Sequence, residues 1–254
     1  MGLLGNLSKA ALLAGIVGFC GACQQGGKDR ADGQEPLTLV NLYIGTTFLG
    51  VAAPFGAVQV GPNNINKGWD WCSGYHYSDS VLIGFAHLHL NGTGCSDTGD
   101  LLFMPYTGKE QTDKGTQENP EAGYASRYSH EQEIARPGYY AVSLSDYGVK
   151  VELTASDRVA FHRYTYPEGA DRRVMVNLKE ANGDDRPVET FLKQVDEHTI
   201  QGYRYSKGWS KDQRIFFTAV FSEPVVLSLI DDQTPVEGTE LKGLNVKGNL
   251  TMNG

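Results

Sequence analysis

From about residue 37 to the end of the chain, hydrophobic and polar positions alternate and no long stretch has helical spacing. Residues 149–154 place valine and leucine on one side of an extended segment and charged or hydroxyl residues on the other. Residues 174–178 repeat this pattern, and residues 215–221 and 225–230 are rich in β-branched and aromatic side chains. The pattern therefore predicts short β-strands.

Short motifs rich in glycine, proline and asparagine separate these segments, for example at residues 136–138, 167–169 and 222–224. Asn182-Gly183 predicts a tight hairpin turn, because both residues tolerate a positive φ. The polar stretch 109–124 is predicted to be a long loop. Short strands at close spacing, with turns between them, predict an all-β sandwich or barrel.

The amino terminus has the pattern of a bacterial lipoprotein signal. Lys9 precedes a short apolar run at 10–19, which is too short to cross a bilayer as a helix. Small residues precede Cys23 and a polar run follows it, so residues 1–22 are predicted to be a signal peptide and Cys23 the lipidated first residue. The alternative is a plain cleaved signal. Lipidation predicts an exported protein anchored at the outer membrane, facing the periplasm or the cell surface.

Residues 23–36 are then a polar tether, predicted to be disordered, and residues 37–254 are the folded body. The net charge of −8 argues against nucleic acid as a partner, whereas a neutral sugar is compatible with it. Cys72 and Cys95 remain in the body, and export would place them where a disulfide can form. Two buried free thiols are an equally good interpretation.

Residues 68–79 hold an unusual group of aromatic side chains. Trp69 and Trp71 alternate with Asp70, so both rings would share one face of an extended segment. Aromatic faces stack on the C–H faces of pyranose rings, while carboxylates and histidines such as His76 bind hydroxyl groups. This segment is therefore a candidate sugar-binding loop. The alternative places both tryptophans in the core.

The next segment, residues 85–100, carries two histidines and two aspartates. His87 and His89 would face the same way on a strand, but no further ligand at zinc spacing is near, which favours hydrogen-bonded core histidines. Asp97 and Asp100 have oxygens that calcium prefers, yet a turn stabilised by aspartate hydrogen bonds is the favoured interpretation.

No pair of carboxylates stands out as the acid and base of a glycosidase. Glu131 and Glu133 are predicted to lie on a surface strand, and Asp184 and Asp185 on a solvated loop. The sequence motifs of serine hydrolases, P-loop nucleotide-binding proteins and helical zinc proteases are absent.

Taken in order along the chain, several segments resemble glycoside hydrolase family 92, a family of calcium-dependent exo-α-mannosidases. The matching segments are residues 40–46, 54–59, 69–79, 87–97, 137–140, 149–154, 158–164 and 208–213. The family usually has a longer glycine- and histidine-bearing loop between the first two segments, where this chain has only residues 47–53. A loop that lines the family's cleft is therefore shortened here.

The resemblance implies an antiparallel β-supersandwich, similar to galactose mutarotase, for the folded body. In the family this sandwich packs on a C-terminal (α/α)6 domain, which carries the Glu acid and Asp base of an inverting hydrolysis and most calcium contacts. The resemblance gives no catalytic or metal residue to this chain. We expect the chain to stop before that domain, to be inactive alone, and to leave uncovered an apolar face and an unpaired strand edge that the domain would protect.

What the resemblance carries over is a contribution to binding α-mannosides of glycans, including N-glycans. The expected substrate-binding residues are Trp69, Asp70, Trp71, His76 and Asp97. The alternative function is a free-standing carbohydrate-binding or structural surface lipoprotein.

Overall fold

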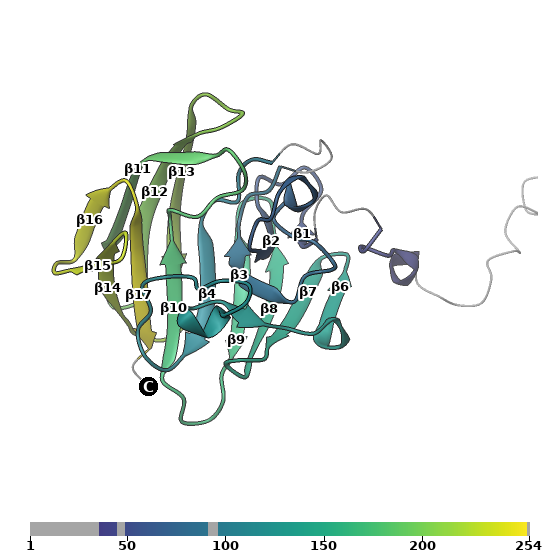
Figure 1. Ribbon diagram of the computed structural model, residues 1–254, viewed down its shortest axis with the longest axis horizontal. Helices are drawn as coiled ribbons and strands as arrows, with labels where there is room; N and C mark the ends of the chain where they lie inside the picture. The colour runs from purple at the N-terminus through teal and green to yellow at the C-terminus, as the bar shows by residue number, and fades with distance from the viewer. Residues whose placement is uncertain (1–35, 45–48, 91–95, 253–254) are drawn as a thin grey trace, which may run out of the picture. The chain divides into compact units, whose positions relative to one another are not determined.

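The structure is a computed structural model that describes residues 36–44, 49–90 and 96–252. The chain divides into a first unit, Met1–Leu39, and a second unit, Val40–Gly254. In the first unit the described residues form one 3-10 turn, η1 (Pro36–Leu39). All described strands belong to the second unit (Figure 1). Cys23 and the predicted signal peptide lie outside the described residues.

The strands of the second unit form one large sheet and two smaller ones, and every pairing is antiparallel. The nine-stranded sheet has the order β1 (Val51–Ala52), β2 (Gln59–Asn64), β3 (Val81–Ala86), β4 (Leu102–Thr107), β10 (Arg172–Asn177), β17 (Val246–Met252), β14 (Val225–Asp231) and β15 (Thr234–Val236), with β5 (Ser126–Arg127) on β3. The first four-stranded sheet is β6 (Glu133–Arg136), β7 (Tyr139–Leu144), β8 (Val149–Ala155) and β9 (Ala160–Thr165). The second is β13 (Gln213–Val220), β12 (Thr199–Lys207), β11 (Arg186–Gln194) and β16 (Glu240–Gly243).

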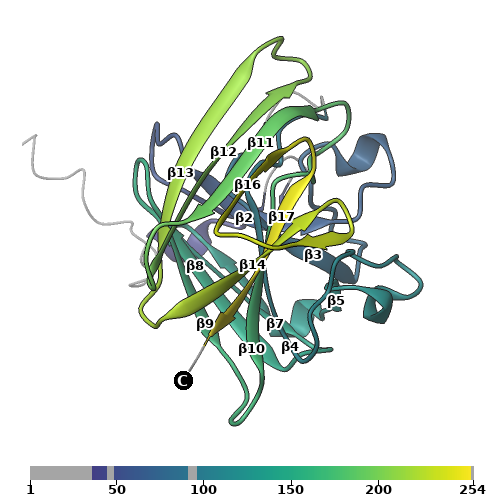
Figure 2. The same ribbon diagram turned by 90° about the vertical axis from the view of Figure 1, so that its left-hand side faces the viewer.

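The two smaller sheets cover different halves of the nine-stranded sheet. Strand β8 contacts β1, β2 and β4, whereas β11 contacts β14 and β17. In Figure 1 the labels of β4 and β10 lie between the two groups of covering strands, and Figure 2 gives the view from the side. The prediction of an all-β, antiparallel supersandwich is thus confirmed.

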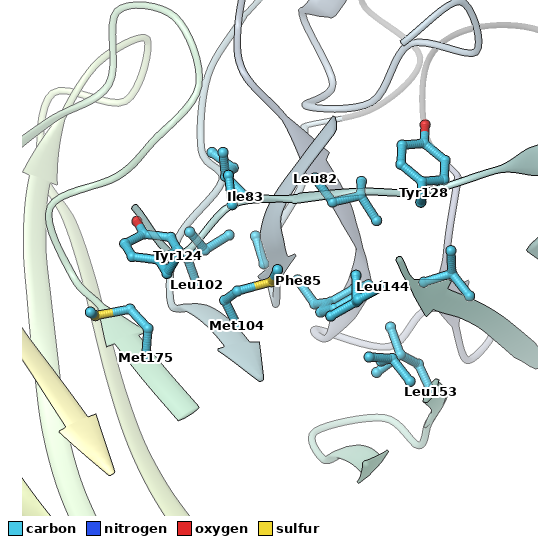
Figure 3. Close-up of a cluster of buried hydrophobic side chains, with 14 of the residues drawn as sticks. Leu82, Ile83, Phe85, Leu102, Met104, Tyr124, Tyr128, Leu144, Leu153 and Met175 are labelled. Atoms are coloured by element: carbon cyan, nitrogen blue, oxygen red, sulfur yellow. The ribbon is translucent and has the colours of Figure 1, made fainter. Parts of the chain in front are cut away.

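Each covering sheet encloses its own hydrophobic core. The core under β6–β9 includes Leu82, Phe85 and Leu153, all at most 1% exposed (Figure 3). The core under β11–β13 includes Val176 and Leu250, which are fully buried. Burying such side chains stabilises the fold by about 1.5–3 kcal/mol each.

Alternation along the strands follows the prediction at β8 but not at β10. Val149, Val151 and Leu153 are buried, as predicted. In β10 both faces are buried, so the predicted alternation of exposure at residues 174–178 was wrong. The loop 109–124 covers the outer face there, and Asn177 donates a hydrogen bond to the hydroxyl of Tyr124 at 2.7 Å.

The turn at Asn182-Gly183 is real, but it does not close a hairpin. The backbone N–H of Asp185 donates to the carbonyl of Asn182 at 3.2 Å, and Gly183 has a φ of 59°. The flanking strands, β10 and β11, belong to different sheets. The turn therefore carries the chain from one layer to the other, which corrects the predicted hairpin.

Three short helical turns lie in the described connections between strands: η2 (Trp69–Trp71) before β3, η3 (Pro120–Ala122) before β5, and η4 (His130–Gln132) before β6. Within the described ranges, no helix has the length and apolar character needed to span a membrane.

Candidate functional site

The aromatic segment forms a single 3-10 turn, η2 (Trp69–Trp71). The predicted extended conformation, with both indole rings on one face, was therefore wrong. Trp69 is 69% exposed and Asp70 is also exposed, whereas Trp71 is half-buried. The ring of Trp71 stacks on His76 at a centroid distance of 4.4 Å. The two tryptophans are thus presented differently, and Trp69 is the one that is free to meet a ligand.

Hydrogen bonds hold Trp71 in place. Its indole N–H donates to Oδ2 of Asp79 at 2.9 Å, and the ammonium of Lys67 lies 3.0 Å from the same oxygen and 5.1 Å from the Trp71 ring. Burial raises the pKa of Asp79, but hydrogen bonds from Lys67, Trp71 and the backbone of Ser80 outweigh it and hold the pKa below its usual value. Trp71 therefore acts as a fixed wall beside the exposed Trp69.

Four loops meet beside this turn. Asn66 donates to the hydroxyl of Ser96 at 3.3 Å, and the backbone N–H of Asn182 donates to the carbonyl of Thr98 at 2.7 Å. The side chain of Asn63 donates to Oδ1 of Asn182 at 3.2 Å. We call these loops the loop cluster, made of residues 63–76, 96–100, 182–185 and 206–209.

The loop cluster holds several buried polar atoms without a hydrogen-bond partner. They are Oδ1 of Asp97, Oγ1 of Thr98 and Nδ2 of Asn182, three of the seven such atoms found among the described residues. Asp97 is only 2% exposed. Buried polar groups in folded proteins are nearly always hydrogen-bonded, so these three atoms distinguish the loop cluster from the rest of the described residues.

Close packing at Asp97 requires a glycine opposite it. A Cβ atom at Gly208 would lie 2.2 Å from Oδ1 of Asp97 and 3.0 Å from the Cα of Asp185. The neighbouring Trp209 is 70% exposed. Trp209 was not among the predicted site residues, although a tryptophan directly after a glycine is visible in the sequence. It adds a second exposed indole to the loop cluster.

A buried ion cluster lies beneath the loops. The guanidinium of Arg204, fully buried, donates to Oδ1 of Asp100 and to Oδ1 of Asp185. Gln213 donates to the other oxygen of Asp100 at 2.8 Å, and Ser206 to that of Asp185 at 3.0 Å. Burial raises the pKa of Asp100 to about 6, against the opposing charge of Arg204.

This cluster corrects two sequence interpretations. Asp185 is buried and not on a solvated loop, whereas the side chain of Asp184 is 93% exposed as predicted. Glu133 is buried as well, although it was predicted on a surface strand. It accepts hydrogen bonds from the hydroxyls of Tyr140 at 2.7 Å and Tyr75 at 3.0 Å. In each case a polar partner from a distant segment makes burial of the carboxylate possible.

The histidines of the segment 85–90 are hydrogen-bonded to the backbone. Nδ1 of His87 donates to the carbonyl of Leu101 at 2.6 Å, and Nδ1 of His89 donates to the carbonyl of Gln59 at 2.7 Å. Both contacts agree with the interpretation favoured from the sequence. In the described part of the chain, no group of three or more His, Cys, Asp or Glu side chains is arranged to hold a metal ion.

The loop cluster offers few carboxylate oxygens to a calcium ion. Asp100 and Asp185 are engaged by Arg204, which leaves Asp97 as the one carboxylate of residues 96–100 and 182–185 that is buried and not paired with this arginine. Calcium takes six to eight oxygen ligands, commonly with several carboxylates. The described residues therefore do not fit a calcium site by themselves.

The predicted disulfide stays a prediction. Cys72 is a buried free thiol in this structure, and Cys95 lies outside the described residues.

Two half-buried histidines, His87 and His162, should make the fold sensitive to mild acid. Burial lowers the pKa of His87 to about 4 and that of His162 well below 6.5, and the two rings stack at 4.9 Å. A depressed histidine pKa means that the unfolded chain binds more protons, so this stabilisation is complete above about pH 6.5 and is lost as the pH falls toward 4. Urea unfolding at several pH values measures this loss.

The double variant His87→Gln, His162→Gln should make the loss of stability between pH 6.5 and 4 smaller, and the part that remains comes from His89, whose pKa burial also lowers to about 4. The matched control is His198→Gln, at a surface histidine whose side chain is 36% exposed, which should leave the slope unchanged. An unaltered slope in the double variant would contradict the assignment.

Comparisons with known proteins show the family to which the β-sandwich is similar. Residues 32–252 match the model of the glycosyl hydrolase family 92 N-terminal domain. A GH92 α-mannosidase from Bacteroides thetaiotaomicron, solved in complex with mannoimidazole, is 36% identical and superposes with a TM-score of 0.82 over 86% of this chain and 30% of its own. A GH92 inverting mannosidase from Bacteroides thetaiotaomicron VPI-5482 is 25% identical, with a TM-score of 0.66 over 82% of this chain and 27% of its own.

An uncharacterized secreted glycosidase of Arthroderma benhamiae is 26% identical over 185 residues, which cover 70% of this chain and 22% of that protein. The chain therefore spans less than a third of the length of these relatives. The family match covers nearly all of the β-sandwich and the loop cluster, so this chain belongs to glycosyl hydrolase family 92, of which it contains the N-terminal domain.

Proposed function

We propose that this chain contributes a mannoside-binding surface to a family 92 α-mannosidase, and that the loop cluster is that surface. The observation that carries the proposal is that the buried polar atoms of Asp97, Thr98 and Asn182 without a partner and the exposed Trp69 belong to loops joined by the hydrogen bonds Asn66–Ser96 and Asn63–Asn182. Solved relatives are described as mannosidases, one of them in complex with mannoimidazole. Glycans that end in α-mannose, including N-glycans, are the expected substrates of the longer enzyme.

The chemistry of the loop cluster suits a pyranose. An exposed indole offers an apolar face to the C–H groups of a sugar ring, and buried acceptors and donors bind its hydroxyls with fixed directions. Asp97 would accept a hydrogen bond from a hydroxyl, and the amide of Asn182 would donate one. Asp70 and His76 lie next to Trp69 and Trp71 and supply further polar groups at the rim.

The same geometry supports binding without hydrolysis by these residues. Glycosidases need an acid and a base, commonly two carboxyl groups about 5–10 Å apart. Asp100 and Asp185 both accept hydrogen bonds from Arg204, so neither is available as a catalytic partner of Asp97. The chain alone is therefore expected to release no mannose. The acid, the base and the calcium contacts of the enzyme are expected in the part of the relatives that this chain does not span.

Titration of the chain with methyl α-D-mannoside, followed by calorimetry and by amide chemical shifts, tests the proposal. We expect weak binding that Trp69→Ala reduces by about tenfold, which corresponds to ~1.4 kcal/mol. Asp97→Asn should also weaken it, because one acceptor oxygen is lost. The matched control is Leu244→Ala, which truncates a side chain that is 51% exposed and lies outside the loop cluster.

Shifts confined to residues 63–76 and 96–100 would support the assignment. Binding that Trp69→Ala leaves unchanged, or no binding at tens of millimolar sugar, would rule it out. Release of mannose from an aryl α-mannoside by the pure chain would contradict the proposed division between binding and catalysis.

We also propose that Cys23 carries the lipid anchor of an exported lipoprotein. The support is the sequence pattern alone, a short apolar run followed by small residues, the cysteine and a polar run. Mass spectrometry of the membrane-extracted protein tests it. A diacylglyceryl-modified Cys23 is the expected result, and a mature chain that begins elsewhere without lipid would refute it.

A further inference from the structure

The covering layer of the sandwich is interrupted between its two sheets. Strand β9 is an edge strand of the sheet β6-β7-β8-β9. Strand β13 is an edge strand of the sheet β13-β12-β11-β16. Each pairs on one side only among the described residues, β9 with β8 and β13 with β12. The nine-stranded sheet below them is continuous (Figures 1 and 2).

A large groove lies between these two edges. It has a volume of about 1020 Å³ and is lined by residues 158–164 on one side and 214–223 on the other. Its floor includes Phe103 of β4, and Met252 at the end of β17 also lines it. The groove therefore follows the interval between β9 and β13 above the middle of the large sheet.

The strands that border the groove are incompletely covered. Ile215, Phe217 and Ala219 of β13 point toward the core yet are only half-buried, whereas Ile200 on the neighbouring β12 is fully buried. On the outer side, Phe161 is 59% exposed and Val220 is 73% exposed. Long apolar edges with free backbone groups promote aggregation, so folded proteins normally pair or cover them.

We propose that the groove is a strand-binding site, filled by one extended segment that hydrogen-bonds to β9 and β13 together and joins the two covering sheets into one. Strand addition obtains most of its affinity from main-chain hydrogen bonds, and apolar side chains at alternate positions of the segment would fill the groove. The occupant is a segment of polypeptide that follows β17 in the longer family members.

Two observations favour this occupant. Met252 reaches the groove, so a segment connected to the end of β17 starts beside its binding site. The relatives extend well beyond the matched region, since this chain spans 30% of the Bacteroides thetaiotaomicron α-mannosidase solved with mannoimidazole. A second copy of the chain is less suitable, because edge-to-edge pairing covers one edge and leaves the other unpaired.

The basic groups of the groove do not point to an anionic ligand. The guanidinium of Arg172 lies 2.7 Å from the carboxylate of Glu223, and that of Arg214 lies 3.0 Å from Asp212. Arg163, which also lines the groove, lies 4.0 Å from Glu152, so three of the four lining arginines, all except Arg158, have a carboxylate within 4.0 Å. An apolar strand is therefore a better match for the groove than a phosphate or a carboxylate.

The test attaches a strand to the protein as it exists. A flexible linker of about six Gly and Ser residues and then the sequence Val-Thr-Val-Thr-Val-Thr are fused after Gly254, which gives a millimolar effective concentration at the groove. The control fusion replaces two of the threonines by proline, which cannot donate the ladder hydrogen bonds. Hydrogen-exchange mass spectrometry follows the amides of β9 and β13.

We expect exchange of both β9 and β13 to slow at least tenfold in the Val-Thr fusion, with a higher Tm, and neither change in the proline control. Because main-chain hydrogen bonds dominate strand addition, the result does not require the natural side chains. Protection of one edge alone, or of neither, overturns the proposal. Protection of either edge in the unfused chain that rises with protein concentration also overturns it, in favour of a second copy. Sugar binding at the loop cluster is measured separately and does not depend on this result.

Discussion

Replacing Arg204 by methionine should cost about 3–5 kcal/mol of the free energy of unfolding, a large part of the ~5–15 kcal/mol typical of a domain. The reason is that Arg204, Asp100 and Asp185 are all buried and their charges compensate one another. Without the guanidinium, two carboxylates remain in the protein interior with no cation. Urea unfolding followed by tryptophan fluorescence measures the loss.

Two further variants serve as controls for Arg204→Met. Arg214→Met removes a guanidinium whose side chain is 61% exposed and paired with Asp212, and it should cost less than about 1 kcal/mol. The triple variant Arg204→Met, Asp100→Leu, Asp185→Leu removes every charge of the cluster and should recover most of the stability. A single Arg204→Met variant that is as stable as the parent would show that the buried charges are not coupled.

The same variant reports on the loop cluster. Asp100 and Asp185 belong to two of its loops, and Arg204 of β12 ties them together. We therefore expect any remaining folded Arg204→Met protein to bind mannoside more weakly. If the triple variant regains stability but not mannoside binding, the charged cluster positions the binding loops in addition to stabilising the fold.

Phe85→Ala should cost about 3–5 kcal/mol as well, through the loss of packing in the core under β6–β9. Phe85 is fully buried on β3 (Figure 3). Its ring lies 6.4 Å from that of Tyr140 on β7. Truncation leaves a cavity that the surrounding strands cannot close, since both layers are held by backbone hydrogen bonds. Calorimetry of the purified chain gives the change in Tm and enthalpy.

The matched controls distinguish cavity formation from a general loss of aromatic surface. Phe85→Leu should cost less than half as much, because most of the volume is kept. Phe216→Ala truncates a ring that is 66% exposed on β13 and should change stability by less than about 1 kcal/mol. Equal losses at Phe85 and Phe216 would contradict the assignment of the core.

Much of the strand content could be predicted because alternation of side chains is a local property. The spacing of Val149, Val151 and Leu153 at every second position predicts their burial. Runs of β-branched and aromatic residues indicate β13 and β14. The alternation failed at β10, where a distant loop covers the outer face. The burial of a strand depends on what covers each of its two faces. In β10 one face is covered by the loop 109–124, which is distant in sequence.

The two segments that hold the predicted site residues lie together, because Asn66, near Trp69, donates a hydrogen bond to Ser96, next to Asp97. That these residues bind a sugar stays a prediction. The relative exposure of Trp69 and Trp71 was not predictable, because it depends on the 3-10 turn and on Asp79. Asn182 was missed, since its hydrogen bond with Asn63 joins positions 119 residues apart. Trp209 was missed although it follows a glycine in the sequence.

The sequence by itself determined the all-β class, the membership of the family and the position of the aromatic loop, because these follow from local spacing and from ordered motifs. Only the tertiary structure decided which carboxylates are buried, how Arg204 compensates them, and that the covering layer is divided between β9 and β13. The physical reason is that charge compensation and strand pairing are interactions between distant segments. Their energies depend on a proximity that the fold creates and that no single segment encodes.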